Sequence, residues 1–236
     1  MDAESARLPL VLMYHSIEPY DADPYRVTVC PERFEHQLRW LRRRGLRGVA
    51  MCELLRDRED GLVGLTFDDG YADFLTEVLP ALCRHGFTAT VFVIAGALGG
   101  HNSWDEPGPR KALMTAADVR RVTDAGMEVG SHSLHHVPLP LVPEGDLRDE
   151  VSRSRSRLAE VTGCAVTGFC YPYGAVGERE VRAVRAAGYD YACAVRSSPL
   201  DGRHALPRAF VGDRDGAARL FAKVARHRLT TGRAAR

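Results

Sequence analysis

The segment "LVGLTFDDGYAD", residues 62–73, joins a strand signal to an unusual pair of charges. Its first six residues form a mainly apolar run, which predicts a buried β-strand. Asp68 and Asp69 follow directly. Two adjacent ionised carboxylates repel each other, so either solvent or a bound cation has to offset that repulsion.

Asp68 and Asp69 need not do the same work. Successive side chains of an extended chain point to opposite sides, so one carboxylate can bind a cation while its neighbour stays free. A plain turn is the alternative, because Asp-Gly after a strand is a common turn and Asp73 would then cap the next helix.

Apolar runs recur along the chain and alternate with amphipathic helical patterns. This alternation predicts an α/β fold of βα units around a parallel sheet, open or closed into a barrel. No repeat or Gly/Ser linker divides residues 1–236, so we expect a single domain. The predicted strands are 8–13, 47–51, 62–67, 88–94, 127–130, 165–170, 191–195 and 208–211, and the predicted helices begin at Pro31, at Thr115 (with a capping-box residue at Asp118), and near residues 146 and 216.

Polar clusters follow three of the predicted strands. "DDGY" (68–71), "SHSLHH" (131–136) and "YPYG" (171–174) each begin where an apolar run ends. In a βα barrel the working residues lie on the loops at the C-terminal ends of the strands. We therefore expect these clusters to share one face and to form a site.

The histidine cluster indicates a metal centre. His132 and His136 are four residues apart, a spacing that lets two imidazoles reach one metal ion, although a pairing of His132 with His135 is also open. Two imidazoles and one carboxylate leave coordination positions for water and substrate, which is typical of catalytic sites. Scattered surface histidines are the plain alternative.

Taken together, these motifs resemble the metal-dependent polysaccharide deacetylases of the NodB-homology, or carbohydrate esterase, family. "TFDDGY" (66–71), "HSLHH" (132–136) and "YPYG" (171–174) are similar to its first three motifs in order and spacing. The resemblance covers about residues 62–174, and "LMYHSI" (12–17) resembles the branch that deacetylates poly-N-acetylglucosamine. It implies a distorted, incompletely closed (β/α) barrel of about seven parallel strands.

The resemblance also implies roles for individual residues. Asp69, His132 and His136 become the ligands of one divalent metal ion, and Asp68 becomes the general base that deprotonates water. The backbone N–H of Tyr173 would donate to the oxyanion. Zinc is the first expectation, with Co²⁺, Ni²⁺ and Fe²⁺ open, because imidazole and carboxylate ligands suit several divalent ions.

The chain departs from the family pattern at the general acid. The stretch "LPRAFV" (206–211), where most of the family has a Leu-x-x-His motif, contains no histidine. His15 is the best candidate, since "MYHS" ends the first apolar run and the N-terminal histidine of the resembling branch takes this role. His204 is held in reserve.

A second departure concerns the partner of the catalytic aspartate. The third family motif usually opens with an arginine, and Cys170 stands in that place. Something else must then hold Asp68 ionised, and Arg208 on the last predicted strand is our hypothesis. We group Arg208 with Tyr173 and Trp104 on the substrate side of the site.

The loop "GALGGHNSWDEPGPRKALM" (96–114) is long and rich in glycine and proline. Trp104 on this loop is a plausible platform for a sugar ring, because aromatic rings stack on pyranose faces while amides and carboxylates bind hydroxyl groups. A self-packed loop is the alternative.

Composition excludes several classes of protein. The 32 basic and 31 acidic residues leave a net charge of +1, which argues against a nucleic-acid partner. The N-terminal apolar run is too short for a signal segment or a membrane span, so we expect a cytoplasmic location. The six cysteines lack a CxxC pair and are expected to be reduced and mostly buried. The oligomeric state is left open.

The leading hypothesis is therefore a metal-dependent deacetylase that acts on linear amide C–N bonds and removes an N-acetyl group from an amino sugar. Its substrate would be an oligosaccharide, a nucleotide- or lipid-linked precursor, or another glycoconjugate. A related metal-dependent amidohydrolase or deformylase acting on a small, non-polymeric amide is the alternative. A binding protein without chemistry fits poorly with a complete Asp68, Asp69, His132 and His136 set.

Overall fold

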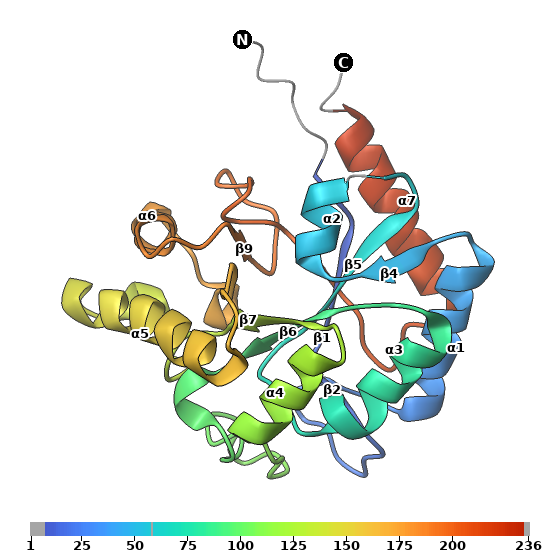
Figure 1. Ribbon diagram of the computed structural model, residues 1–236. Coiled ribbons are helices and arrows are strands. Elements are labelled where there is room, and N and C mark those ends of the chain that lie inside the picture. The colour runs from blue at the N-terminus through green and yellow to red at the C-terminus, as the bar shows by residue number, and fades with distance from the viewer. Residues whose placement is uncertain (1–7, 58, 234–236) are drawn as a thin grey trace.

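The computed structural model describes residues 8–57 and 59–233, and its centre is one curled sheet of eight strands (Figure 1). The strand order is β10-β1-β5-β6-β7-β8-β9, while β4 pairs with the first half of β5, and every pairing in the sheet is parallel. The strands are β1 (Val11–Tyr14), β4 (Arg47–Val49), β5 (Leu62–Phe67), β6 (Thr90–Val93), β7 (Glu128–Ser131), β8 (Gly168–Cys170), β9 (Tyr191–Cys193) and β10 (Ala209–Phe210). All eight predicted strands are confirmed.

The barrel is incompletely closed, as predicted. Among the described residues, the two ends of the sheet are joined only through an isolated parallel bridge between Cys193 of β9 and Leu206, just before β10. Ala209 and Phe210 then pair with β1. The chain from Leu206 to Phe210 thus crosses from the last strand to the first, and Arg208 lies on this crossing.

Helices surround the outside of the curled sheet (Figure 1). The predicted helices are confirmed, including the capping box of Thr115 and Asp118, but three short helices, α2, α3 and α6, were not predicted. Met51 was assigned to a strand and instead begins α2, because a helix of seven residues is too short to show a clear period. The helices are α1 (Pro31–Arg43), α2 (Met51–Asp57), α3 (Leu79–His85), α4 (Ala116–Asp124), α5 (Glu144–Thr162), α6 (Glu178–Ala186) and α7 (Ala217–Arg233). None of these helices, in the part of the chain that the structure describes, has the length and apolarity that a membrane crossing needs.

Smaller elements complete the fold. The two-residue strands β2 (Ser16–Ile17) and β3 (Thr28–Val29) pair with each other, and a π-helix, Phe74–Val78, leads into α3. Neither strand was predicted, since two residues carry no periodicity. The strand β2 begins two residues after β1 ends, and β3 follows the loop that leaves β2.

An aromatic cluster fixes the end of β5. The ring of Phe67 stacks on Tyr14 with centroids 5.1 Å apart, and it meets Phe34 of α1 and Phe74 edge-on at 5.8 and 5.2 Å. All four side chains are buried. Edge-to-face and stacked contacts add to the burial energy of such rings, so the residue after Phe67 has little freedom to move.

The cysteine prediction was only half right. All six cysteines, each within the described residues, are free, but Cys52, Cys83 and Cys164 are exposed while Cys170 and Cys193 are buried. The exposed cysteines lie on α2, on α3 and after α5, where the outer faces of the helices meet solvent. A cysteine on a helix surface gives no sequence signal that separates it from a core thiol.

Thr115→Ala should lower the free energy of unfolding by about 1 kcal/mol, because the N-cap hydroxyl that accepts from the Asp118 N–H of α4 is lost. Chemical denaturation measures this. Ser156→Ala, which removes an exposed hydroxyl on α5 bonded only within its own helix, is the control and should change stability by less than about 0.5 kcal/mol. Equal effects of the two substitutions would contradict a capping role.

Candidate active site

The two aspartates after β5 are both buried and diverge. The Asp68 N–H still donates to the Tyr14 carbonyl at 3.0 Å, which extends the pairing with β1 by one residue. Asp69 and Gly70 then adopt left-handed conformations, with φ of 72° and 74°. Aspartate tolerates this region better than most residues, and the turn sends the two carboxylates toward different partners.

Asp69 meets two imidazoles. Its Oδ1 lies 3.3 Å from His132 Nε2 and 3.4 Å from His136 Nε2, and all three side chains are buried. His132 directly follows β7, while Ser133 and His136 have positive φ, so a tight loop folds His136 back beside His132. The candidate ligand atoms of the three residues lie within 4.8 Å of one another.

A backbone carbonyl fixes the tautomer of His132. Its Nδ1 lies 2.9 Å from the Cys170 carbonyl oxygen of β8, to which it donates. This bond aims Nε2 at Asp69. A ring nitrogen held by a backbone carbonyl is the usual support for a metal-binding histidine.

The charge states suit a divalent cation. Burial raises the pKa of Asp69, but the hydrogen bond from His132 and the nearby His136 outweigh it and leave the pKa lowered. Burial lowers the pKa of His136 to about 4, so its imidazole is neutral at pH 7. Burial also disfavours charge on His132, yet the side chain of Cys170 and the carboxylates of Asp69 and Asp68 raise its pKa. The pocket therefore demands positive charge, and one carboxylate with two imidazoles fits a divalent ion.

Asp68 is held by Arg208 instead. Nη1 donates to Oδ1 at 2.7 Å and Nη2 to Oδ2 at 2.8 Å, in a two-pronged pair. Burial raises the pKa of the Asp68 carboxyl, but the charge and hydrogen bonds of Arg208 outweigh it, and the net pKa is lowered. The Arg208 side chain is fully buried, so our placement of it on the substrate side is corrected: it contacts Asp68.

Arg208 also decides which of two candidate sets of metal ligands is available. Asp68, His132 and Cys170 come close enough to form a second set of ligands. Nη2 of Arg208, however, lies 3.0 Å from Cys170 Sγ as well as contacting Asp68. A permanent cation already occupies that side, so the set around Asp69 is the one left for a metal ion.

His15 lies on the other side of Asp68. Its Nε2 is 4.0 Å from Asp68 Oδ2, the side chain is 17% exposed, and its ring packs near Phe210. His204 lies elsewhere. Its Nε2 donates a hydrogen bond to the Tyr189 carbonyl at 2.9 Å, and its Nδ1 accepts one from Arg185 Nε. Of the two candidate acids, the structure brings only His15 to Asp68.

His135 does not join the cluster. Its Nδ1 lies 2.6 Å from Glu150 Oε1, and its side chain is mostly exposed. The other oxygen of Glu150 accepts from the N–H groups of Leu134 and His135. No pattern in the sequence indicated that Glu150, a buried residue of α5, would hold this loop and so keep His135 away from Asp69.

Two aromatic side chains flank His136. The ring centroid of Trp104 is 4.5 Å from that of His136, and the centroid of Tyr173 is 4.6 Å away on a turn where Tyr173 has φ of 58°. Tyr173 is 56% exposed. Trp104 comes from the long loop predicted to reach the site, and both rings lie against His136.

Lys111 tethers this loop and was not recognised in the sequence. Its Nζ donates to Ser16 Oγ, Glu18 Oε1 and Thr28 Oγ1 at 2.6 to 2.9 Å, which ties the loop to β2 and β3. Lysine is rarely buried unless it is paired, and one buried lysine in a polar loop has no periodic signature. The tether keeps Trp104 beside His136.

Comparison with known proteins agrees with this geometry. The sequence model of the polysaccharide deacetylase family matches residues 56–192, more than half of the chain, and the chain belongs to that family. YxkH of Bacillus subtilis (strain 168) is 26% identical over 215 residues, which cover 87% of this chain and 72% of that protein. The chain is an enzyme of a class that hydrolyses amide bonds of glycans, as predicted.

Two further relatives are informative. The peptidoglycan-N-acetylglucosamine deacetylase PgdA of Listeria monocytogenes is 30% identical over 132 residues, which span 56% of this chain but only 25% of PgdA. The structure of IcaB from Ammonifex degensii superposes with a TM-score of 0.78 at 25% identity, covering 92% of this chain and 97% of that one. The incompletely closed barrel is thus shared with solved deacetylases.

Arg208→Met should lower the free energy of unfolding at pH 7 by roughly 3–5 kcal/mol, because it leaves the buried Asp68 charge without a partner. In the wild type, the lowered pKa of Asp68 adds stability above the ordinary aspartate pKa, and this is lost as the pH falls through the folded-state value. The difference between the two proteins should therefore shrink in acid. Denaturation at several pH values measures it.

Arg42→Met, at an exposed position of α1, is the matched control and should change stability by less than about 0.5 kcal/mol. A loss for Arg208→Met that stayed the same from pH 7 down to the acid range would show that the arginine acts through packing alone.

Proposed function

We propose that this chain removes the N-acetyl group of an amino sugar in a glycan, with water as the nucleophile and one divalent cation, zinc in the first instance, held by Asp69, His132 and His136. The observation that carries the proposal is the division of the adjacent aspartates. Asp69 faces the histidines and Asp68 faces Arg208. Asp69 is therefore available to bind a cation, and Asp68 is available to accept a proton.

A cation bound there would lower the pKa of water and polarise the amide carbonyl. Asp68 supplies the base. Its lowered pKa keeps the carboxylate ionised at neutral pH, and the two-pronged contact with Arg208 fixes its plane. A base that is oriented before the substrate arrives loses little entropy during proton transfer.

His15 is proposed as the general acid. Its position 4.0 Å from Asp68, partly exposed just after β1, supports this role, in which it would protonate the nitrogen that leaves when the C–N bond breaks. Protonation of that nitrogen releases an amine rather than an amide anion. Two proton-transfer groups close together, one acid and one base, are what amide hydrolysis requires.

Tyr173 and Trp104 are proposed to hold the sugar. The positive φ of Tyr173 turns the backbone at the rim of the histidine cluster, where its N–H would donate to the developing oxyanion. Trp104 offers a ring face beside His136 for a pyranose. The name of PgdA supports N-acetylglucosamine as the sugar to test first.

Asp68→Asn should reduce kcat for acetate release from an N-acetylglucosamine oligomer by at least roughly 100-fold, because the base is lost while the ligand set is intact. Bound zinc, measured by mass spectrometry, should stay at the wild-type level. Asp69→Asn should lose both the metal and the activity. Loss of zinc in the Asp68 variant with retention in the Asp69 variant would reverse the assigned roles.

His15→Ala should lower kcat by roughly 100-fold with little change in KM, because a proton donor acts in the transition state and not in binding. His204→Ala serves as the control, since its ring is engaged by Tyr189 and Arg185, and its kcat should stay within about threefold of wild type. The same acetate assay measures both. A larger loss for His204→Ala would move the acid to that residue.

A further inference from the structure

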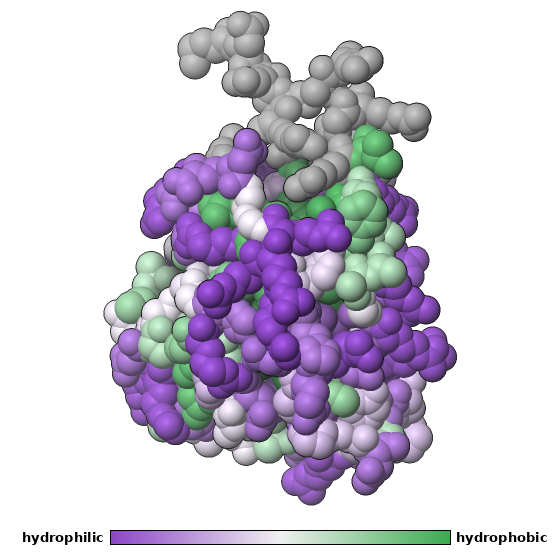
Figure 2. All heavy atoms as spheres, turned by 90° about the vertical axis from the view of Figure 1, so that its right-hand side faces the viewer, coloured by the Kyte–Doolittle hydropathy of each residue, from purple (hydrophilic) through white to green (hydrophobic). Residues whose placement is uncertain are grey.

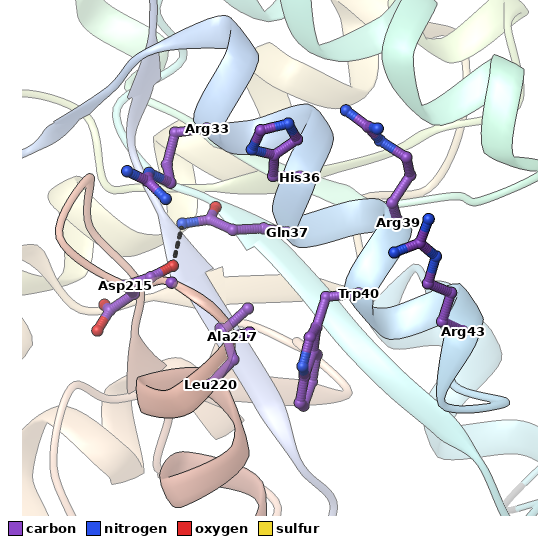
Figure 3. A pocket seen from close by; sticks show the side chains of 10 residues that line it. Arg33, His36, Gln37, Arg39, Trp40, Arg43, Asp215, Ala217 and Leu220 are labelled. Atoms are coloured by element: carbon purple, nitrogen blue, oxygen red, sulfur yellow. Dashed lines mark hydrogen bonds between the residues drawn. The ribbon is translucent and has the colours of Figure 1, made fainter.

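A cavity outside the active site lies between α1 and the start of α7. It has a volume of about 370 Å³ and is lined by both helices, with Arg33, His36, Gln37 and Trp40 from α1 facing Gly216 and Leu220 (Figure 3). Cavities of this size accept small organic ligands. Its residues have no part in the chemistry around Asp68 and Asp69.

The amino end of α7 opens on this cavity. The 17-residue helix begins after Gly216, whose missing side chain cannot cap it, and its first turn is formed by Ala217, Ala218, Arg219 and Leu220. Backbone N–H groups at a helix start carry partial positive charge and favour an anion. Arg33 reaches the same place, because a methyl group built on Gly216 would lie 3.7 Å from its Nη1.

A buried acceptor supplies a second, independent sign of a ligand. Gln37 is 2% exposed, and its amide nitrogen donates to the carbonyls of Gly212 and Asp215 at 3.2 and 3.0 Å. These two bonds fix which end of the amide is the nitrogen, so the remaining end is the oxygen Oε1. Within the described residues Oε1 has no hydrogen-bond partner. Figure 3 shows this oxygen pointing toward the side lined by Arg33 and His36. A buried acceptor without a partner is costly, and a ligand hydroxyl would satisfy it.

Trp40 gives the cavity an aromatic wall. The indole ring lies beside Leu220 and Ala217 at one end of the cavity (Figure 3). Arg44 stacks between Trp40 and Phe221, with its guanidinium carbon 5.2 Å from each ring centroid, which steadies the indole. A flat or ring-shaped group is the natural neighbour of such a wall.

The charge around the cavity is positive. Asp215, the acid in the lining, is already engaged: its Oδ2 lies 3.3 Å from Lys223 Nζ and accepts from the Gly212 N–H. Arg33 and Arg43 have no ion-pair partner in the described part of the chain. Figure 2 looks onto this side of the molecule and shows strongly hydrophilic residues over most of it.

We propose that this cavity binds a phosphate monoester carried on a hydroxyl-bearing ring, as in a sugar phosphate or a nucleotide. The phosphate lies at the amino end of α7 against Arg33, a ring hydroxyl donates to Gln37 Oε1, and the ring lies on Trp40. Charge-assisted bonds from a guanidinium and backbone N–H groups are the usual phosphate contacts. The site is independent of the proposed deacetylase function.

Titration calorimetry on the full chain tests this with glucose 6-phosphate, uridine monophosphate, inorganic phosphate and glucose. None of these carries an N-acetyl group, so the result does not depend on deacetylation. We expect saturable binding of at least one phosphate ester below about 1 mM and none by glucose. The tighter of the two esters identifies the source of the phosphate.

Arg33→Ala should weaken that binding at least about tenfold, whereas Arg42→Ala, an exposed arginine of the same helix outside the cavity, should change it less than about twofold. Trp40→Ala should weaken the ester but not inorganic phosphate. The proposal is overturned if neither ester binds, if glucose binds as tightly as its phosphate, or if the two arginine variants lose affinity equally.

Discussion

Two adjacent buried carboxylates cannot share one counter-charge, and this constraint organises the site. Asp68 and Asp69 are both almost fully buried, where repulsion between two negative charges is poorly screened. The turn at Asp69 separates them. Asp68 receives a guanidinium that never loses its charge, and Asp69 receives two imidazoles whose charge can change. A permanent cation suits a base that must stay ionised, and neutral imidazoles suit a metal ion.

The incomplete barrel makes this division possible. Arg208 and Asp68 are 140 residues apart in the chain, and the guanidinium arrives on the crossing segment that bridges β9 and β1. The histidines arrive from the end of β7, and the Cys170 carbonyl of β8 orients one of them. A complete barrel would need a paired strand in that gap, whereas the loosely paired segment here lets the Arg208 side chain reach Asp68.

Most of this could be predicted where sequence pattern and strand geometry agree. The ends of parallel strands meet on one face, which brought Asp68 and His132 together in advance. Arg208 was a separate hypothesis, drawn from the cysteine that stands where the third motif usually has an arginine. His136 was named as the ligand in advance, but the reason that His135 is excluded, its contact with Glu150 on the following helix, could not be predicted from the sequence. The seven-residue helices α2 and α3 and the Lys111 tether were missed, since very short helices and single buried cations carry no period. The helix α6 was missed although it is as long as the predicted α4. Tertiary contacts, which a local pattern does not contain, decide such cases.

Anomalous X-ray diffraction from crystals of the zinc-loaded protein tests the central claim most directly, because it locates the metal without assumptions about the reaction. The account predicts one peak within bonding distance of Asp69 Oδ1, His132 Nε2 and His136 Nε2, with Asp68 still paired to Arg208 and outside that distance. A peak bonded to Asp68 or to Cys170, or the lack of any peak at Asp69 in crystals that bind zinc elsewhere, would contradict it.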